Sequence, residues 1–480
     1  MNETANHIIK QATLEFQYNG KTDGLAFQQN VRDWFDEFIQ KLNDEMNEIS
    51  VDDQIISIDS LQLEVELSGV DWRQQVSHMI MKQLKDRVRL IRTGAVSSTG
   101  YAEKKLTQHF AEVFLYYLQY GNLPWYTLPL SSEKWNHQVE TLMIQADEKF
   151  VQALKELLSQ SNASRERLLQ TVPFQTAVEL FRSASVLRPF IHQRLVHDLQ
   201  LLMKIAIIHQ YSDLKQVVYR AFLLNLSEKA DPLQNKQELA LYIHKKALLN
   251  PAIVESIKNL QFQSVRLIAL KNELTETEQK TKAKREVRKY KQQKQFKENE
   301  EFVHQQEGLQ LLVNQPVFIS NAGLVLVAAF LPALFKKAKF SGDDHQILYI
   351  DKAVCFVHYL STGNKNMQEY ELVLPKILCG AAIDKPVDTG KFQVDKTLKK
   401  EAEEVLTSVI EYWNILQNTS IDGLRESFLK RNGKLTYDGK DWLLQVEQQP
   451  YDMLLQHLPW NISMIKLPWM EKMLKTEWIY

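Results

Sequence analysis

The 480-residue chain contains little cysteine, and this scarcity excludes a disulfide scaffold. Its two cysteines, Cys355 and Cys379, lie 24 residues apart in apolar surroundings. Reduced thiols in such surroundings are typical of a cytoplasmic compartment. We therefore expect both cysteines to be buried core residues. The first ten residues lack the basic and apolar regions of a secretory signal, so we also expect no such signal.

The chain also lacks an excess of charge of either sign. It has 58 lysine and arginine residues against 59 aspartate and glutamate residues. This balance removes any global electrostatic reason for binding nucleic acid or an anionic membrane. Electrostatic recognition must therefore depend on local runs of charge.

Long hydrophobic runs are absent as well. The nearest candidate for a membrane span is Val317 to Phe335, but Asn321, Gly323 and Pro332 interrupt it. Its length is borderline for a bilayer, so we interpret it as a buried helix. Membrane insertion after a later triggering event is the alternative, and liposome flotation would detect it.

Catalytic and metal-binding motifs are missing too. His192 and His197 are five residues apart, which does not place both rings on one helical face for metal ligation. Gly363 to Lys365 lacks the further glycine and the serine or threonine of a phosphate-binding loop. Cys355 and His358 share a predicted helix, and we interpret them as core packing. We therefore predict no enzyme activity, no cofactor, no metal and no small-molecule substrate.

What the chain does contain is mainly α-helical patterning. Residues 1–69 predict a small α+β module, with a strand from Thr13 to Tyr18, an amphipathic helix from Leu25 to Ile49 and a strand from Ile56 to Leu67. Residues 70–312 are rich in helix formers, and scattered prolines predict several helices there. Between Pro251 and Gly308 the sequence has neither glycine nor proline, and a helix of that length would extend about 85 Å.

One segment of this helical middle, residues 280–297, is strongly basic. A solvated helix or coiled coil is one interpretation, and a stripe facing nucleic acid or the inside of a protein tube is the other. Aromatic residues are sparse beside it, which disfavours stacking on single-stranded bases. Its basic residues are Lys280, Lys282, Lys284, Arg285, Arg288, Lys289, Lys291, Lys294 and Lys297.

The C-terminal region, residues 313–480, is predicted to be a mostly helical domain with one β-hairpin. The hairpin strands are Lys434 to Tyr437 and Trp442 to Glu447, and the turn residues Asp438 to Asp441 join them. Predicted helices cover 324–335, 353–360, 370–379, 398–418 and 451–458.

The tail repeats an aromatic phrase: Leu458-Pro459-Trp460 is followed by Leu467-Pro468-Trp469. Proline restricts the backbone, so each phrase holds a leucine and an indole in a preset relation. The two indoles either seal the domain's own core or dock a partner, and the sequence leaves both open. Asp452 is predicted to cap a helix or to accept a hydrogen bond from a buried indole. The candidate docking residues are Trp442, Tyr451, Asp452, Leu458, Pro459, Trp460, Leu467, Pro468, Trp469, Met470 and Trp478.

An ordered series of sequence blocks resembles one known family, the tape measure proteins of extracellular contractile injection systems. The resemblance covers about the first 70 and the last 165 residues, and it is carried by 7–9, 58–63, 318–324, 330–332, 370–374, 378–380, 418–435, 442–447, 451–455, 458–462, 465–470 and 477–478. Such particles resemble phage tails.

The resemblance implies a structural protein that sets the length of the inner tube. It would assemble in the cytoplasm, lie in the tube lumen and have one end at the spike or baseplate hub. Spike, hub and inner tube proteins are the implied partners, and analogy with phage tails suggests a homotrimer. The alternative is a helical scaffold or chaperone that binds nucleic acid or acidic proteins through 280–297. Nucleic acid is disfavoured as a partner, and a membrane is disfavoured except after ejection.

Overall fold

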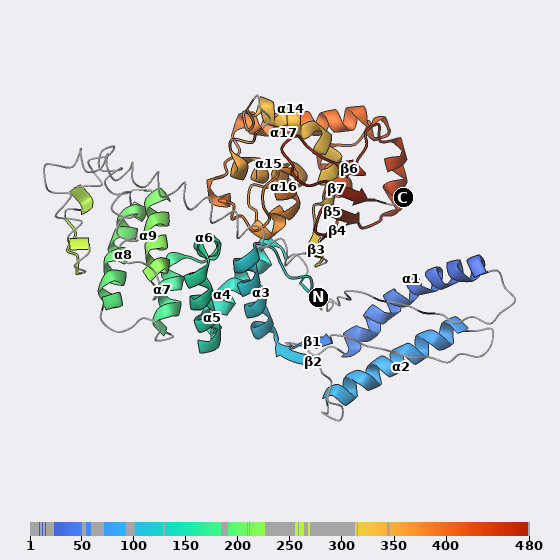
Figure 1. Ribbon diagram of the computed structural model, residues 1–480, viewed down its shortest axis with the longest axis horizontal. Helices are drawn as coiled ribbons and strands as arrows, with labels where there is room; N and C mark the ends of the chain where they lie inside the picture. The colour runs from blue at the N-terminus through green and yellow to red at the C-terminus, as the bar shows by residue number, and fades with distance from the viewer. Residues whose placement is uncertain are drawn as a thin grey trace. The chain divides into compact units, whose positions relative to one another are not determined.

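The computed structural model forms two compact units, residues Met1–Glu112 and Val113–Tyr480 (Figure 1). Its elements are mainly α-helices, which confirms the predicted fold class. The structure describes residues 9, 12, 15, 24–49, 54–58, 72–92, 101–127, 130–183, 191–208, 210, 212–225, 255–257, 259–263, 267–268, 313, 315–342 and 346–478.

The first unit is built on two parallel helices, α1 (Gly24–Ile49) and α2 (Trp72–Arg92). Arg73 donates to the side chain of Asn30 at 2.8 Å, and the Trp34 indole donates to Ser77 at 2.9 Å. Both pairs are 43 residues apart, so the two helices run in the same direction. Apolar residues at helical spacing face one another between them and form a core of Trp34, Phe38, Leu42, Val76, Met81, Leu84 and Val88.

Two short strands complete this unit. Strand β1 (Gln54–Ile58) pairs antiparallel with β2 (Tyr101–Lys105). The predicted helix from Leu25 is confirmed, and the second predicted strand begins at Gln54. Most of the predicted strand 13–18 and the end of the second predicted strand lie outside the described residues.

The second unit begins with a helical array, within which we call residues 113–225 the helical segment. Side-chain caps begin several of its helices; for example, Asp147 accepts the Phe150 amide at 2.8 Å. The prediction of several helices between residues 70 and 312 is confirmed for the described part. These helices are α3 (Leu106–Tyr120), α4 (Ser132–Gln145), α5 (Glu148–Gln160), α6 (Asn162–Thr171), α7 (Phe174–Ser183), α8 (Ile191–Ile208) and α9 (Ser212–Asn225).

Residues 313–478, here called the C-terminal domain, combine short helices with a five-stranded sheet. The sheet order is β3-β4-β5-β7-β6, and only the β5–β7 pairing is parallel. The strands are β3 (Val317–Ile319), β4 (Gly433–Tyr437), β5 (Trp442–Val446), β6 (Met464–Ile465) and β7 (Leu474–Glu477). The predicted hairpin is therefore confirmed, and the structure adds that it lies at the centre of a larger sheet.

Helices of three types surround this sheet. The α-helices are α14 (Leu331–Lys337), α15 (Ile350–Thr362), α16 (Val373–Leu378), α17 (Lys396–Tyr412) and α18 (Ile421–Leu424). The 3-10 helices are η1 (Ala322–Phe330), η2 (Glu369–Leu372), η3 (Thr389–Lys391), η4 (Asn414–Leu416) and η6 (Pro450–His457), and η5 (Arg425–Leu429) is a π-helix.

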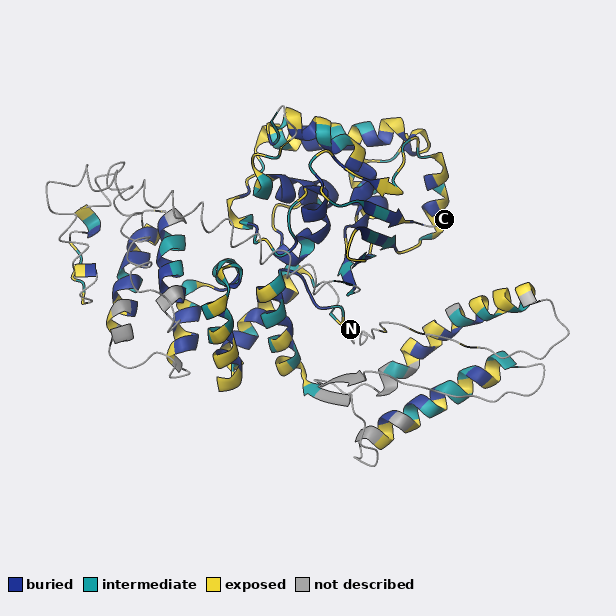
Figure 2. Cartoon of the chain, in the orientation of Figure 1, coloured by how far each residue is buried: buried dark blue, intermediate teal, exposed yellow. Residues whose placement is uncertain are grey.

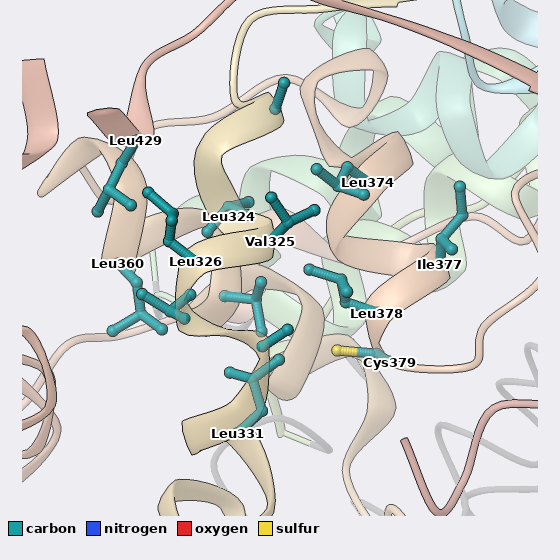
Figure 3. Close-up of a cluster of buried hydrophobic side chains, with 14 of the residues drawn as sticks. Leu324, Val325, Leu326, Leu331, Leu360, Leu374, Ile377, Leu378, Cys379 and Leu429 are labelled. Carbon is teal, nitrogen blue, oxygen red and sulfur yellow. The ribbon is translucent and has the colours of Figure 1, made fainter. Parts of the chain in front are cut away.

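The core of the C-terminal domain gathers around η1, whose residues 322–328 are all buried (Figures 2 and 3). Leu324, Val325 and Leu326 contribute to the same apolar core as Leu374 and Leu378 of α16. A helix that is apolar on every side must be surrounded by protein, so η1 forms the centre of the domain.

Four predicted helices differ in form from the structure. The predicted helix 370–379 is a 3-10 helix up to Leu372 and an α-helix from Val373 to Leu378. The segment 324–335 is buried as expected, but it winds as a 3-10 helix up to Phe330. This tighter winding brings Gly323 against the Phe428 carbonyl, where a Cβ atom would lie only 1.7 Å away. Likewise, 450–457 is a 3-10 helix. Helix α17 ends at Tyr412 rather than at Asn418, because Trp413 leaves the helical conformation and donates its indole N–H to the Leu454 carbonyl.

Candidate docking surface of the C-terminal domain

The two repeated phrases place their indoles against different parts of the same domain. Trp460 donates its Nε1–H to the Leu326 carbonyl at 3.0 Å, and Trp469 donates to the Leu378 carbonyl at 2.7 Å. Both rings are half-buried. Each indole therefore ties the tail to a buried helix while part of its ring reaches the surface.

The second phrase fits into a tight space. The Trp469 ring stacks on Phe335 with centroids 5.1 Å apart. The Met470 amide donates to the Leu467 carbonyl at 2.9 Å, which closes a turn around Pro468. Gly380 lies against this turn with φ of 67°, and a Cβ atom there would lie 2.6 Å from the Trp469 carbonyl oxygen. Only a glycine combines this backbone conformation with such a close approach.

Asp452 is the buried acceptor that joins these tail elements. Its carboxylate accepts two hydrogen bonds from Arg431, at 2.7 and 2.8 Å, and one from the Trp478 indole at 3.0 Å. It also accepts the Gln449 amide at 2.9 Å, which caps η6. Both predicted roles, helix cap and indole acceptor, are confirmed.

The electrostatics of this group follow from its contacts. Burial by itself would raise the pKa of Asp452, but the hydrogen bonds from Arg431, Trp478 and the Gln449 amide together hold the pKa below its ordinary value. The Arg431 guanidinium lies over the Tyr451 and Trp478 rings, at 5.5 and 5.2 Å from their centroids. The carboxylate is therefore ionised, and its charge is neutralised inside the fold.

Many of the eleven candidate docking residues belong to the interior of this domain. Five of them, Trp442, Asp452, Leu467, Met470 and Trp478, are buried. Leu458, Trp460 and Trp469 are half-buried, and Tyr451, Pro459 and Pro468 are exposed. The buried members support the surface from inside the domain. Only the exposed and half-buried members and their neighbours can therefore contact a partner directly.

We group six exposed or half-buried apolar residues of η1, α17, η4, η6 and the first phrase under the name aromatic patch. At its centre the Phe330 ring stacks on Tyr412, with centroids 6.2 Å apart, and meets the edge of Trp460 at 5.1 Å. Tyr412 is 65% exposed and Met453, on η6, is 62% exposed. Helices η4 and η6 contact each other beside it. We define the patch as Phe330, Tyr412, Ile415, Tyr451, Met453 and Trp460.

Four members of the patch, Phe330, Tyr412, Ile415 and Met453, were not among the candidate docking residues predicted from the sequence. The signal for Tyr412 was present, because it falls outside the buried stripe of α17 that includes Leu406 and Val409. The helical spacing therefore predicts that Tyr412 is exposed. Ile415 and Met453 carry no such signal, since their exposure depends on how η4 and η6 pack.

The one cysteine–histidine pair noted in the sequence has no nucleophilic character. Burial raises the pKa of the Cys355 thiol to about 12 and lowers the pKa of His358 to about 4. A thiolate–imidazolium pair would need both shifts reversed. Both side chains are buried, as core packing requires, and Cys379 is buried as well.

The structure also bears on the predictions about a metal site, a membrane span and the basic segment. Across the residues that the structure describes, no group of histidine, cysteine, aspartate and glutamate side chains is arranged to hold a metal ion. No described helix is both long and apolar enough for a membrane span. The segment Val317–Phe335 instead supplies β3, η1 and the start of α14. The basic residues of 280–297 lie outside the described residues.

The chain thus combines a mainly helical fold with exposed aromatic residues on its C-terminal domain. Comparison with protein families matches residues 6–478 to the contractile injection system tape measure proteins, and the chain belongs to that family. Neither the curated proteins nor the solved structures returned a match. The family assignment thus spans both compact units.

Proposed function

We propose that this tape measure protein sets the length of the inner tube through its helical middle and docks at the spike or baseplate hub through the aromatic patch. The family match supports the ruler role. The observation that supports docking is the exposure of Tyr412 and Met453, together with the ring contacts that link Tyr412 to the half-buried Trp460 through Phe330. Aromatic residues and methionines are enriched in interface centres, and a rigid domain presents them at low entropic cost.

The docking proposal is tested by substituting exposed members of the patch in the full chain. Tyr412→Ser and Met453→Ser remove apolar surface without touching the Asp452 network. We expect each change to weaken capture of spike or hub proteins at least tenfold, since interface anchors contribute about 2 kcal/mol or more. Ile208→Ser is the matched control, because Ile208 is 74% exposed on α8. Equal capture by all three variants would contradict docking through the patch.

The ruler proposal is tested by shortening the helical middle. Removing about 28 residues between positions 252 and 307 should shorten the assembled tube by about 40 Å if that segment is an extended helix, at about 1.5 Å per residue. Particle lengths measured on electron micrographs give the result. Tubes of unchanged length would contradict the ruler role and leave the docking proposal standing.

The remaining assignments complete the proposal. The protein acts without catalysis or cofactor, assembles in the cytoplasm as a homotrimer and then lies in the tube lumen. Binding of nucleic acid or acidic proteins through residues 280–297 is the alternative function. Salt-sensitive DNA binding by the purified chain, lost when those lysines are neutralised, would favour it.

A further inference from the structure

The helical segment contacts the C-terminal domain through three buried charged side chains. Arg167 on α6 donates its Nε–H to Glu369 Oε1 at 3.1 Å, and Lys376 donates its Nζ–H to the same oxygen at 2.6 Å. Their side chains are 0%, 2% and 1% exposed for Arg167, Glu369 and Lys376. We call this cluster the ion triad. It joins residues 202 positions apart in the sequence.

Main-chain carbonyls from both partners complete the coordination of the triad. Arg167 donates to Leu118 at 2.9 Å and to Gln119 at 3.0 Å, and it also donates to Asp384 of the C-terminal domain. Lys376 donates to Ile383 at 2.7 Å. The Arg167 side chain thus bridges the two parts with hydrogen bonds.

The rest of the contact combines aromatic packing with hydrogen bonds, and the Tyr370 ring also lies 6.1 Å from that of Tyr117. Tyr370 donates its hydroxyl to the Leu130 carbonyl at 2.9 Å, and its ring packs 4.9 Å from Trp135. At a second point, Gln216 of α9 donates to Asp388 at 3.2 Å and accepts from Lys391 at 3.1 Å. Tyr370 is therefore the aromatic anchor among hydrogen bonds and ion pairs.

This closed arrangement leaves some polar groups poorly satisfied. Glu369 Oε2 is buried and accepts no hydrogen bond from the described residues. Burial lowers the pKa of Lys376 despite its contact with Glu369. If the two parts separated, water would hydrate all of these groups. Opening therefore recovers hydration free energy that opening of an apolar interface would not recover. The C-terminal domain keeps a separate apolar core, composed of residues 317–478.

We propose that this interface is a releasable joint, which holds the helical segment against the C-terminal domain in the free chain and opens when the protein extends inside the tube. The inference rests on the tape measure function proposed above. The ion triad fixes how the helical segment and the C-terminal domain align in the closed joint. Hydration of the same charges lowers the free energy of opening. The C-terminal domain stays folded throughout, because its own core does not include the helical segment.

Hydrogen exchange of the full chain tests whether the joint opens by itself. We expect α6 amides to exchange at least tenfold faster than those of β4 and β5, because the joint opens before the sheet does. Glu369→Gln should accelerate α6 exchange at least a further tenfold and leave the sheet unchanged. Glu404→Gln, which alters an exposed pair with Lys337, is the control and should change neither. Equal exchange of α6 and the sheet, or equal acceleration of both, would overturn the joint.

A second variant tests whether opening is needed for assembly. Arg167→Met, Glu369→Leu and Lys376→Met together replace the triad by apolar side chains of similar size, a change that is often neutral or stabilising in other proteins. We expect at least tenfold slower α6 exchange and at least a tenfold loss of assembled particles. Slower exchange with normal particle number and length would overturn the joint but leave the ruler role intact. If the triple variant does not fold, exchange of Glu369→Gln decides alone.

Discussion

The Trp478 indole donates to the Asp452 carboxylate at 3.0 Å, so the end of β7 is tied to the helix that precedes the first Leu-Pro-Trp phrase. Arg431 binds the same carboxylate from the hairpin side. Three segments of the tail therefore meet at one buried acceptor. The tail is an integral part of the domain, and partner contacts are proposed for the aromatic patch beside it.

We predict that Asp452→Asn destabilises the C-terminal domain by about 3–5 kcal/mol, because it leaves the buried Arg431 guanidinium without a charged partner. Chemical unfolding followed by tryptophan fluorescence measures this change. Glu471→Gln is the control, because Glu471 is 91% exposed. A loss as small as that of the control would show that the buried pair adds little net stability.

The same carboxylate predicts a pH dependence. Its folded pKa lies below the ordinary value of 3.8, so its contribution is complete above the pKa of the unfolded chain and is lost as pH falls through the folded value. Wild-type stability should therefore fall more steeply below about pH 4 than that of Asp452→Asn. Unfolding midpoints measured from neutral pH to about pH 2 test this. Parallel pH profiles of the two proteins would contradict it.

We predict that Gly380→Ala destabilises the domain by more than Gly439→Ala. Both glycines have positive φ, so both variants incur about 1–2 kcal/mol of backbone strain. Only at Gly380 does the added Cβ also collide with the Trp469 carbonyl oxygen, since Gly439 has open space around it. Thermal unfolding of the two variants isolates the collision. Equal losses of stability in the two variants would mean that the turn at Trp469 shifts to accommodate the added Cβ atom without further cost.

The two repeated indoles give a matched pair of predictions. Trp469→Phe and Trp460→Phe keep an aromatic ring but remove the N–H donors to Leu378 and Leu326. Each should cost about 1–3 kcal/mol, because a buried carbonyl loses its partner. Tyr412→Phe is the control for a change on the exposed patch. If both indole variants were as stable as wild type, the Leu-Pro-Trp phrases would stabilise the domain through ring packing alone.

Local sequence patterns predicted much of the secondary structure. The helix from Leu25 follows from apolar residues at helical spacing, and the hairpin follows from alternating residues around Asp438 to Asp441. The helix-cap and indole-acceptor roles of Asp452 were also predicted from its position, whereas its buried partner Arg431, 21 residues away, was not. These inferences succeed because each depends on residues close together in the chain.

Tertiary packing decided the rest. The sequence did not show that Trp460 would donate to Leu326, 134 residues away, or that Arg167 would meet Glu369, 202 residues away. Nor could periodicity reveal the tight winding of η1 or the close approach of Gly323 to Phe428. By itself the sequence determined the helical class, the hairpin and the family resemblance. Only the folded structure decided which aromatic residues are core and which are surface, because burial depends on neighbours distant along the chain.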